Sequence, residues 1–176
     1  MSKAFIFWFT GLSGSGKTTI AKGVKPLLEK EKYSVLILDG DHVRDNLHKH
    51  LGFTEKDIKE NNELIAQLCK QYSEDYDVIL VPVISPYKDS RDSARRLISN
   101  KFYEIYLSAG VDIVEKRDTK GLYAKARNKE IDNLIGYSEG SVYHAPQEPD
   151  FIVDSGKEDV KDSISKFFDF VISKVK

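Results

Sequence analysis

A glycine-rich segment near the amino end constrains the fold of this chain more than any other feature. It reads GLSGSGKT over residues 11–18 and directly follows the apolar run FIFWFT. A strand that ends in such a loop, with a helix beginning at its lysine, is the pattern of a phosphate-binding loop. Glycines let backbone N–H groups turn inward around phosphate oxygens, and the helix N-terminus adds partial positive charge. We therefore expect a strand, a phosphate-binding loop and a helix in succession.

The side chains of this loop indicate the bound molecule. Lys17 is placed to reach the β- and γ-phosphates of ATP, and the Thr18 hydroxyl to join the coordination shell of Mg²⁺, so ATP and Mg²⁺ are the expected cofactors. The alternative, a glycine-rich turn that binds nothing, does not account for the agreement of strand, loop and helix. The residues expected to contact ATP are Gly11, Ser13, Gly14, Ser15, Gly16, Lys17, Thr18, Thr19 and Arg117.

Short apolar runs alternate with longer helical patterns over the 176 residues, as in βαβ units around a mostly parallel sheet. The expected strands are residues 4–10, 34–39, 78–84, 102–107 and 151–153. The expected helices are residues 17–31, 58–74, 90–99, 111–117 and 160–174, with an N-cap at Thr54. Because the runs VLIL and VILVPVI are apolar on both faces, helices should cover both sides of the sheet. We predict an α/β fold, the three-layer sandwich of P-loop NTPases with a mostly parallel five-stranded sheet, as a single domain over residues 1–176.

Charge and cysteine content exclude several classes of partner. The chain has 27 Lys and Arg against 28 Asp and Glu, so no overall basic field draws it to nucleic acid or to an anionic membrane. The one cysteine, Cys69, forms no internal disulfide and lies in an apolar helical stripe. The amino end lacks the length of a membrane span and the cleavage site of a signal peptide. We expect a cytoplasmic protein with a small-molecule nucleotide substrate, and a homodimer is compatible with the sequence.

Residues 118–149 differ from the rest of the chain because they are rich in turn residues and barely periodic beyond one short helix. A compact domain seldom carries about 30 such residues without a functional reason, and a mobile lid is the usual one. A disordered surface insertion is the alternative. The basic residues at its start are Lys116, Arg117, Lys120, Lys125 and Arg127. One or two of them are expected to neutralise charge on the transferred phosphoryl group.

Two acidic residues, Asp39 and Asp41, follow the second expected strand. Open α/β sheets bind ligands in the crevice at this edge. There, Asp41 is placed to accept a proton or hydrogen bond from an attacking hydroxyl, and Asp39 to hold magnesium-bound water. An Asx turn with a helix cap is the alternative. Arg44, one turn into the next helix, suits an anionic group on the acceptor.

The third expected strand ends at Ile84-Ser85-Pro86-Tyr87. Since proline cannot extend the ladder of hydrogen bonds, the chain should turn there and bring Ser85 and Tyr87 to the same crevice. A simple strand terminator is the alternative. Phe53 is either a core residue or a platform for a nucleotide base, and the core is the default for an isolated phenylalanine.

Six segments together resemble adenylylsulfate kinase: GLSGSGKTT, LDGDHVRDNL, LGF, KEN, VISPYKDSRDSAR and EKRDTKGLYAKAR. That family transfers the γ-phosphoryl group of ATP to the 3′-hydroxyl of adenosine 5′-phosphosulfate, with magnesium, on a P-loop fold. The catalytic residues that this reading implies are Lys17, Asp39, Asp41, Ser85 and Lys120, with Thr18 and Asp39 at the metal. The acceptor-binding residues it implies are Asp41, Arg44, Phe53, Asn61, Ile84, Ser85, Lys120 and Leu134.

The sequence departs from the family pattern at the acceptor. Where the family usually carries an arginine, five residues after Phe53, this chain has Ile58, and the family's ENIRR becomes ENNEL. In the lid, the family's FTGI becomes Leu134-Ile135-Gly136-Tyr137. An arginine suits a charged oxygen face, and an aromatic ring stacks better than leucine, so these losses point away from adenylylsulfate.

The chain is similar to a divergent branch of the family, the cytidine diphosphoramidate kinases of capsule phosphoramidate pathways. Their acceptor is also a nucleotide with a free 3′-hydroxyl, and we expect cytidine diphosphoramidate to be the acceptor here. Adenylylsulfate, phosphorylated in sulfate assimilation, is the alternative acceptor. A non-catalytic nucleotide-binding regulator is the alternative of another class, but such a protein need not retain both loop acids and a basic lid.

Overall fold

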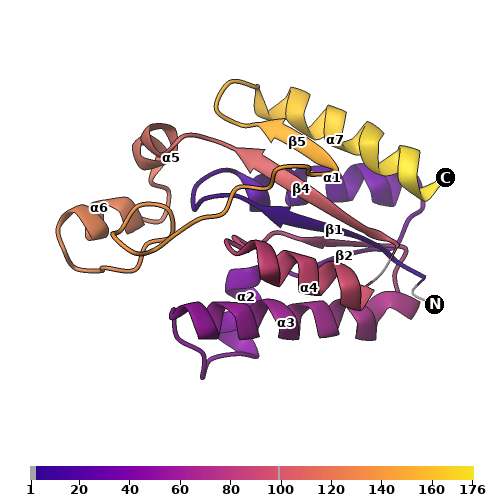
Figure 1. Cartoon of the computed structure of the whole chain (residues 1–176). Helices are drawn as coiled ribbons and strands as arrows, with labels where there is room; N and C mark the ends of the chain where they lie inside the picture. Colours follow the sequence, from indigo (N-terminus) through magenta and orange to yellow (C-terminus); the bar gives the residue numbers. More distant parts are fainter. Residues whose placement is uncertain (1–2, 99) are drawn as a thin grey trace.

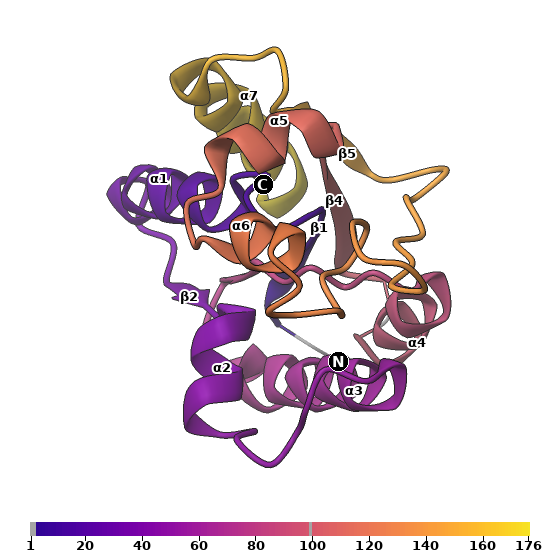
Figure 2. The ribbon, with the colours of Figure 1, turned by 90° about the vertical axis from the view of Figure 1, so that its left-hand side faces the viewer.

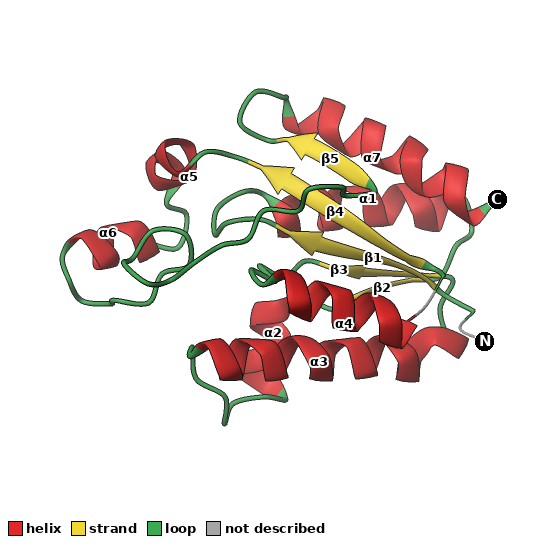
Figure 3. Ribbon diagram, in the orientation of Figure 1, coloured by secondary structure: helices red, strands yellow, loops and turns green. Residues whose placement is uncertain are grey.

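The computed structural model describes residues 3–98 and 100–176, and its centre is a sheet of five strands (Figure 3). The strands are β1 (Phe5–Thr10), β2 (Val35–Ile37), β3 (Val78–Val81), β4 (Phe102–Ser108) and β5 (Phe151–Asp154). They lie in the order β2-β3-β1-β4-β5, and every neighbouring pair is parallel. The phosphate-binding loop therefore follows the central strand.

Helices cover both faces of this sheet, as predicted. The helices are α1 (Lys17–Lys30), α2 (Gly40–Asn46), α3 (Glu55–Gln71), the 3₁₀ turn η1 (Tyr72–Glu74), α4 (Lys88–Ile98), α5 (Val111–Arg117), α6 (Leu122–Arg127) and α7 (Val160–Val175). Helices α1 and α7 pack on one face, and α3 and α4 on the other (Figure 1). The fold class predicted from the sequence is confirmed.

The side chains of β1 show how the two apolar layers form. Ile6 and Trp8 point into the layer beneath α3 and α4, whereas Phe7 and Phe9 point into the layer beneath α1 and α7. All four side chains are fully buried, since residues on a strand alternate between its faces. Each buried side chain of this size contributes about 1.5–3 kcal/mol relative to an exposed one.

Several element boundaries differ from the predicted ones for local reasons. β3 ends at Val81, because Pro82 has no N–H to extend the ladder. The prediction that Pro86 ends this strand is therefore wrong. β2 is short because Asp39 leaves the sheet to cap α2, where its side chain accepts a hydrogen bond from the N–H of Asp41.

The helix predicted from residue 58 begins at Glu55 instead, and the predicted cap is confirmed. Thr54 and Asp57 form a capping box in which each side chain accepts a bond from the other's backbone N–H. The predicted helix over residues 90–99 begins at Lys88, and its predicted last residue, Ser99, lies outside the described residues.

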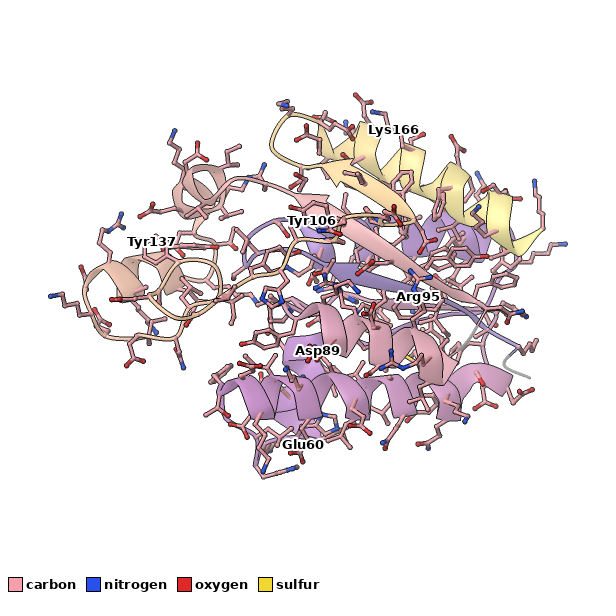
Figure 4. All side chains as sticks on the ribbon, in the orientation of Figure 1. Glu60, Asp89, Arg95, Tyr106, Tyr137 and Lys166 are labelled. Carbon is pink, nitrogen blue, oxygen red and sulfur yellow. The ribbon has the colours of Figure 1, made fainter. Side chains whose placement is uncertain are left out.

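The lid, residues 118–149, projects with α5 from the carboxyl edge of the sheet (Figures 1 and 2). A small apolar cluster holds its base, in which Val114, Tyr123 and Leu134 are buried against Leu12. Tyr137, labelled in Figure 4, meets Tyr123 edge-on with ring centroids 5.4 Å apart. The described lid is therefore packed rather than disordered, and its mobility stays a prediction. No helix among the described residues combines the length and the apolar character needed to cross a bilayer.

Candidate active site

A cleft of about 380 Å³ opens between the phosphate-binding loop, α2, the first turns of α3 and the lid. The predicted site residues that line it are Ser13, Gly14, Ser15, Gly16, Lys17, Thr18, Thr19, Asp41, Arg44, Phe53, Asn61, Ile84, Ser85, Arg117 and Lys120. Gly11 and Asp39 lie behind its wall and contact lining residues through hydrogen bonds. The structure thus gathers nearly all the predicted residues at one place, although they come from five separate parts of the chain.

Backbone geometry explains the glycines of the phosphate-binding loop. Gly14 and Gly16 have φ angles of 78° and 98°, in the left-handed region that favours glycine. At Gly11, a Cβ atom would lie 2.8 Å from the carbonyl oxygen of Leu107. The loop can therefore fold tightly against β4 only with these residues.

Lys17 is the first residue of α1, and its side chain folds back onto this loop. Its ammonium group donates to the carbonyl oxygens of Gly11, at 2.9 Å, and Leu12, at 2.7 Å. Burial and the positive charge of Lys120 together lower the pKa of Lys17 to about 7, although the carboxylates of Asp41 and Asp39 oppose this shift. A buried cation that has only neutral hydrogen-bond acceptors is suited to receive an anion. The loop therefore fits the phosphates of a nucleotide.

Thr18 and Asp39 meet behind the loop. The Thr18 hydroxyl donates to the Asp39 carboxylate at 2.7 Å, while the other oxygen of Asp39 caps α2. The predicted magnesium site and the helix cap, which the sequence left as alternatives, are thus compatible uses of one side chain. Hydroxyl and carboxylate oxygens are the ligands that Mg²⁺ prefers, usually with several retained waters.

Asp41 and Lys120 form an ion pair across the cleft, from α2 to the lid. Arg117 also reaches the loop, donating to the carbonyl oxygens of Gly14 and Ser155. Arg127 instead pairs with Glu115 at 2.8 Å and does not line the cleft. Of the basic residues predicted at the lid's start, Arg117 and Lys120 are therefore the two that the structure brings to the cleft.

Phe53 lies at the mouth of the cleft. Its side chain is 60% exposed, so the default prediction of a core position is wrong. The reason is the loop between α2 and α3, which Arg44 fixes by donating to the carbonyl oxygens of Leu51 and Gly52. The Arg44 guanidinium lies 4.7 Å from the centroid of the Phe53 ring. An exposed ring beside a cation is a suitable surface for a nucleotide base.

Ser85 is held in a strained position on the opposite wall. Its φ angle is 42°, which costs a non-glycine residue about 1–3 kcal/mol. The buried Arg91 donates to the Ser85 carbonyl oxygen at 2.8 Å, and the Asn62 side chain donates to its hydroxyl at 3.2 Å. Such strain persists only where neighbouring groups enforce it, and it is common at functional sites.

Two predicted positions lie elsewhere. Leu134 does not line the cleft but packs in the lid's own core, because the chain turns at that point and presents Ile135 to the cleft instead. Tyr87 is buried against Ile58 and Ile135 rather than delivered to the cleft. Ile58 and Ile135 thus give the acceptor end of the cleft an apolar wall.

Sequence reasoning missed some lining residues. Asn62 and Ile135 lie in two segments, ENNEL and Leu134-Ile135-Gly136-Tyr137, where the sequence departs from the family pattern, so the pattern assigned neither residue a role. Ser155 and Glu158, which follow β5, also line the cleft. The rule that ligands bind at the carboxyl ends of parallel strands would have found these two.

The arrangement defines a class of enzyme. A nucleotide bound at the loop would present its terminal phosphate toward Asp41 and the lid cations, and such sites act by positioning and charge stabilisation rather than by covalent chemistry. The cleft is that of a P-loop kinase.

Comparison with known proteins narrows this class to one family. The family model described as adenylylsulphate kinase matches residues 3–154. The adenylyl-sulfate kinase of Bacillus velezensis is 42% identical over 170 residues, covering 96% of this chain and 85% of the relative. That of Halothermothrix orenii is 45% identical over 176 residues, covering 98% and 91%. This chain belongs to the adenylylsulphate kinase family, and it is a phosphotransferase that acts on a nucleotide hydroxyl.

A solved structure agrees with this assignment. The Mycobacterium tuberculosis APS kinase CysC, in complex with AMPPNP and APS, matches with a TM-score of 0.90 and 32% identity, covering 98% of this chain and 99% of that one. The family uses ATP with Mg²⁺, so the predicted cofactors are confirmed. The relatives reported above are named adenylyl-sulfate kinases or APS kinase, and none of them is named a cytidine diphosphoramidate kinase.

Proposed function

We propose that this chain transfers the γ-phosphoryl group of ATP to the 3′-hydroxyl of adenylylsulfate. The observation that carries the proposal is the position of Asp41, which lines the same cleft as the phosphate-binding loop and the exposed ring of Phe53. The adenylyl-sulfate kinases at 42% and 45% identity support this choice of acceptor.

In this proposal each residue has a separate task. Lys17 holds the β- and γ-phosphates, and Asp41 orients the acceptor hydroxyl and takes up its proton. Lys120, already paired with Asp41, stabilises charge on the transferred group. Thr18 and Asp39 would hold Mg²⁺, which neutralises phosphate charge when bound.

Cytidine diphosphoramidate is the second candidate acceptor, favoured by one observation. Ile58, at a position where the family pattern has an arginine, lines the cleft together with Ile135. An arginine at this position would bind an all-oxygen face and disfavour a terminal nitrogen donor, because it offers hydrogen-bond donors only. Isoleucine does neither, so its presence removes a feature that would select adenylylsulfate.

A coupled assay of ATP consumption, with adenylylsulfate and cytidine diphosphoramidate measured side by side, tests these proposals. We expect acceptor-dependent consumption with a higher kcat/KM for adenylylsulfate. A higher value for cytidine diphosphoramidate would reverse the order of the two candidates. Slow hydrolysis that ignores both acceptors would instead support the nucleotide-binding regulator.

Two further proposals concern the setting of the enzyme. We place the reaction in the cytoplasm, where ATP is available, and we keep the homodimer as one assembly that is compatible with the sequence. Light scattering on the purified protein, read as the molar mass of the eluting species against 20.0 kDa for one chain, tests the assembly.

A further inference from the structure

A buried histidine stands behind one of the residues that line the acceptor end of the cleft. His48 is 7% exposed and Asn61 is 4% exposed. The Nδ1 atom of His48 lies 2.8 Å from the side-chain oxygen of Asn61. Asn61 lines the cleft, whereas His48 does not. The side chain of His48 can therefore affect a bound acceptor through Asn61, without touching the acceptor itself.

The loop between α2 and α3 fixes the position of His48. Its backbone N–H donates to the carbonyl oxygen of Val43 at 3.2 Å, and its carbonyl oxygen accepts from the N–H of Leu51 at 3.0 Å. Arg44 binds the same loop through the carbonyl oxygen of Leu51. Because α2 and α3 lie side by side at this end of the molecule (Figure 2), the loop brings the histidine ring against α3.

The structure places the side-chain oxygen of Asn61, and not its amino group, toward His48. A carbonyl oxygen accepts hydrogen bonds and cannot donate, so the Nδ1 atom of His48 must carry the proton. Because the oxygen of Asn61 faces His48, the amino group of Asn61 is the part of the side chain that can contact a molecule in the cleft. Without this contact, an asparagine amide can rotate and exchange its donor and acceptor ends.

We propose that His48 is a positioning residue, whose Nδ1–H holds Asn61 so that its amino group faces oxygen atoms of the acceptor nucleotide. The inference rests on the proposed function, because it takes the ligand at this end of the cleft to be a nucleotide acceptor. A donor fixed in advance costs less entropy on binding than one that must be ordered. Loss of the His48 contact should therefore weaken binding of the acceptor and leave binding of ATP unchanged.

Substitution separates positioning from packing. We expect His48→Ala to raise the KM for adenylylsulfate about tenfold, the scale of one hydrogen bond, with the KM for ATP nearly unchanged. The melting temperature should fall as well, because the substitution removes a buried side chain and leaves the Asn61 oxygen without this partner. His48→Asn should restore acceptor binding, because its Nδ2–H is as far from the backbone as the histidine Nδ1–H. His48→Gln should not restore it.

The matched control is His50→Ala, which changes an exposed histidine in the same loop. It should leave both KM values unchanged. Equal KM values for His48→Asn and His48→Gln would overturn the proposal.

A double-mutant cycle tests whether His48 acts through Asn61. If it does, His48→Ala should add almost nothing to the loss caused by Asn61→Ala, since the amide that it orients is already gone. Fully additive losses in acceptor KM would mean that the two residues act independently, and would overturn the proposal.

The tautomer of His48 gives a readout that needs no turnover. In the ligand-free protein at pH 8, nitrogen NMR of the neutral ring should show the proton on Nδ1. A proton on Nε2 would overturn the inference whatever the acceptor is. The Nδ1 tautomer in a protein that phosphorylates neither acceptor would instead overturn the proposed function and leave the contact between His48 and Asn61 intact.

Discussion

The Thr18 hydroxyl donates a 2.7 Å hydrogen bond to the Asp39 carboxylate, joining the first turn of α1 to the N-cap of α2. The two residues follow different strands, and they meet because the carboxyl ends of parallel strands share one edge of the sheet. This contact brings together the two residues of the predicted magnesium site.

Replacing Asp39 by asparagine should impair magnesium use without unfolding α2. Asparagine caps a helix about as well as aspartate, so the melting temperature should change little. Loss of the carboxylate should lower activity about 10–100-fold, as removal of outer partners of a metal usually does. Kinetics over a range of Mg²⁺ concentrations measure this effect. An unchanged magnesium requirement would contradict the role of Asp39.

The ion pair between Asp41 and Lys120 should matter for turnover far more than for stability. Its side chains are 65% and 52% exposed, and exposed pairs contribute little to folding. Asp41→Asn should lower kcat about 10²–10⁴-fold, the usual contribution of a positioned acid or base, with the melting temperature nearly unchanged. A variant with near-normal kcat would refute the role of Asp41.

A matched control for that variant is available on α4. Lys88 and Asp92 form an ion pair at 2.6 Å, with side chains 66% and 42% exposed, and neither lines the cleft. Asp92→Asn should therefore leave both kcat and the melting temperature nearly unchanged. A comparable loss of kcat here would mean that the effect at Asp41 is not specific to the site.

Asp77 should give the fold a defined pH dependence. The backbone N–H and the hydroxyl of Ser34 both donate to its carboxylate, at 2.9 and 2.7 Å, and these bonds lower the pKa of Asp77 below its ordinary value. A carboxyl group with a lowered pKa stabilises the fold above the unfolded pKa of about 4, and this contribution is lost as pH falls through the folded pKa.

Asp77→Asn should therefore lower the free energy of unfolding by about 1 kcal/mol at neutral pH. The partial exposure of Asp77 keeps this value small. The difference from the parent protein should shrink below about pH 4. Urea unfolding across pH 3–7 measures it. As a control, Asp169→Asn, at an exposed position on α7, should show no such trend. A constant difference at every pH would contradict the assignment to Asp77.

The sequence was sufficient where function depends on local geometry. The loop at residues 11–18 carries its own signal, since glycine spacing, the lysine and the preceding strand all indicate one structure. Thr18 and Asp39 were both predicted near magnesium, Thr18 from the loop motif and Asp39 from the rule on strand ends. The exact end of β3 could not be predicted. Pro82 and Pro86 can each end a strand, and only the observed pairing with β1 shows that Pro82 does so.

Features that depend on the packing of loops could not be predicted in this way. Nothing periodic around Phe53 distinguishes an exposed ring from a core one. In the lid, Ile135 and not Leu134 faces the cleft. Which of these neighbours does so depends on the packing of Leu134 into the apolar cluster around Tyr123. His48 and Asn61 are separated by 13 positions across a loop, and no spacing rule pairs them.

Ile58 is the position at which acceptor preference should be easiest to change. It is 8% exposed and lies in the cleft wall on α3, where an arginine would extend its guanidinium into the cleft. Since guanidinium groups bind planar oxygen faces with two hydrogen bonds, Ile58→Arg should raise kcat/KM for adenylylsulfate relative to cytidine diphosphoramidate about tenfold or more. Leu64→Arg, on the same helix but away from the cleft, is the control and should leave the ratio unchanged. If both variants leave it unchanged, Ile58 does not select the acceptor, and the apolar wall no longer favours cytidine diphosphoramidate.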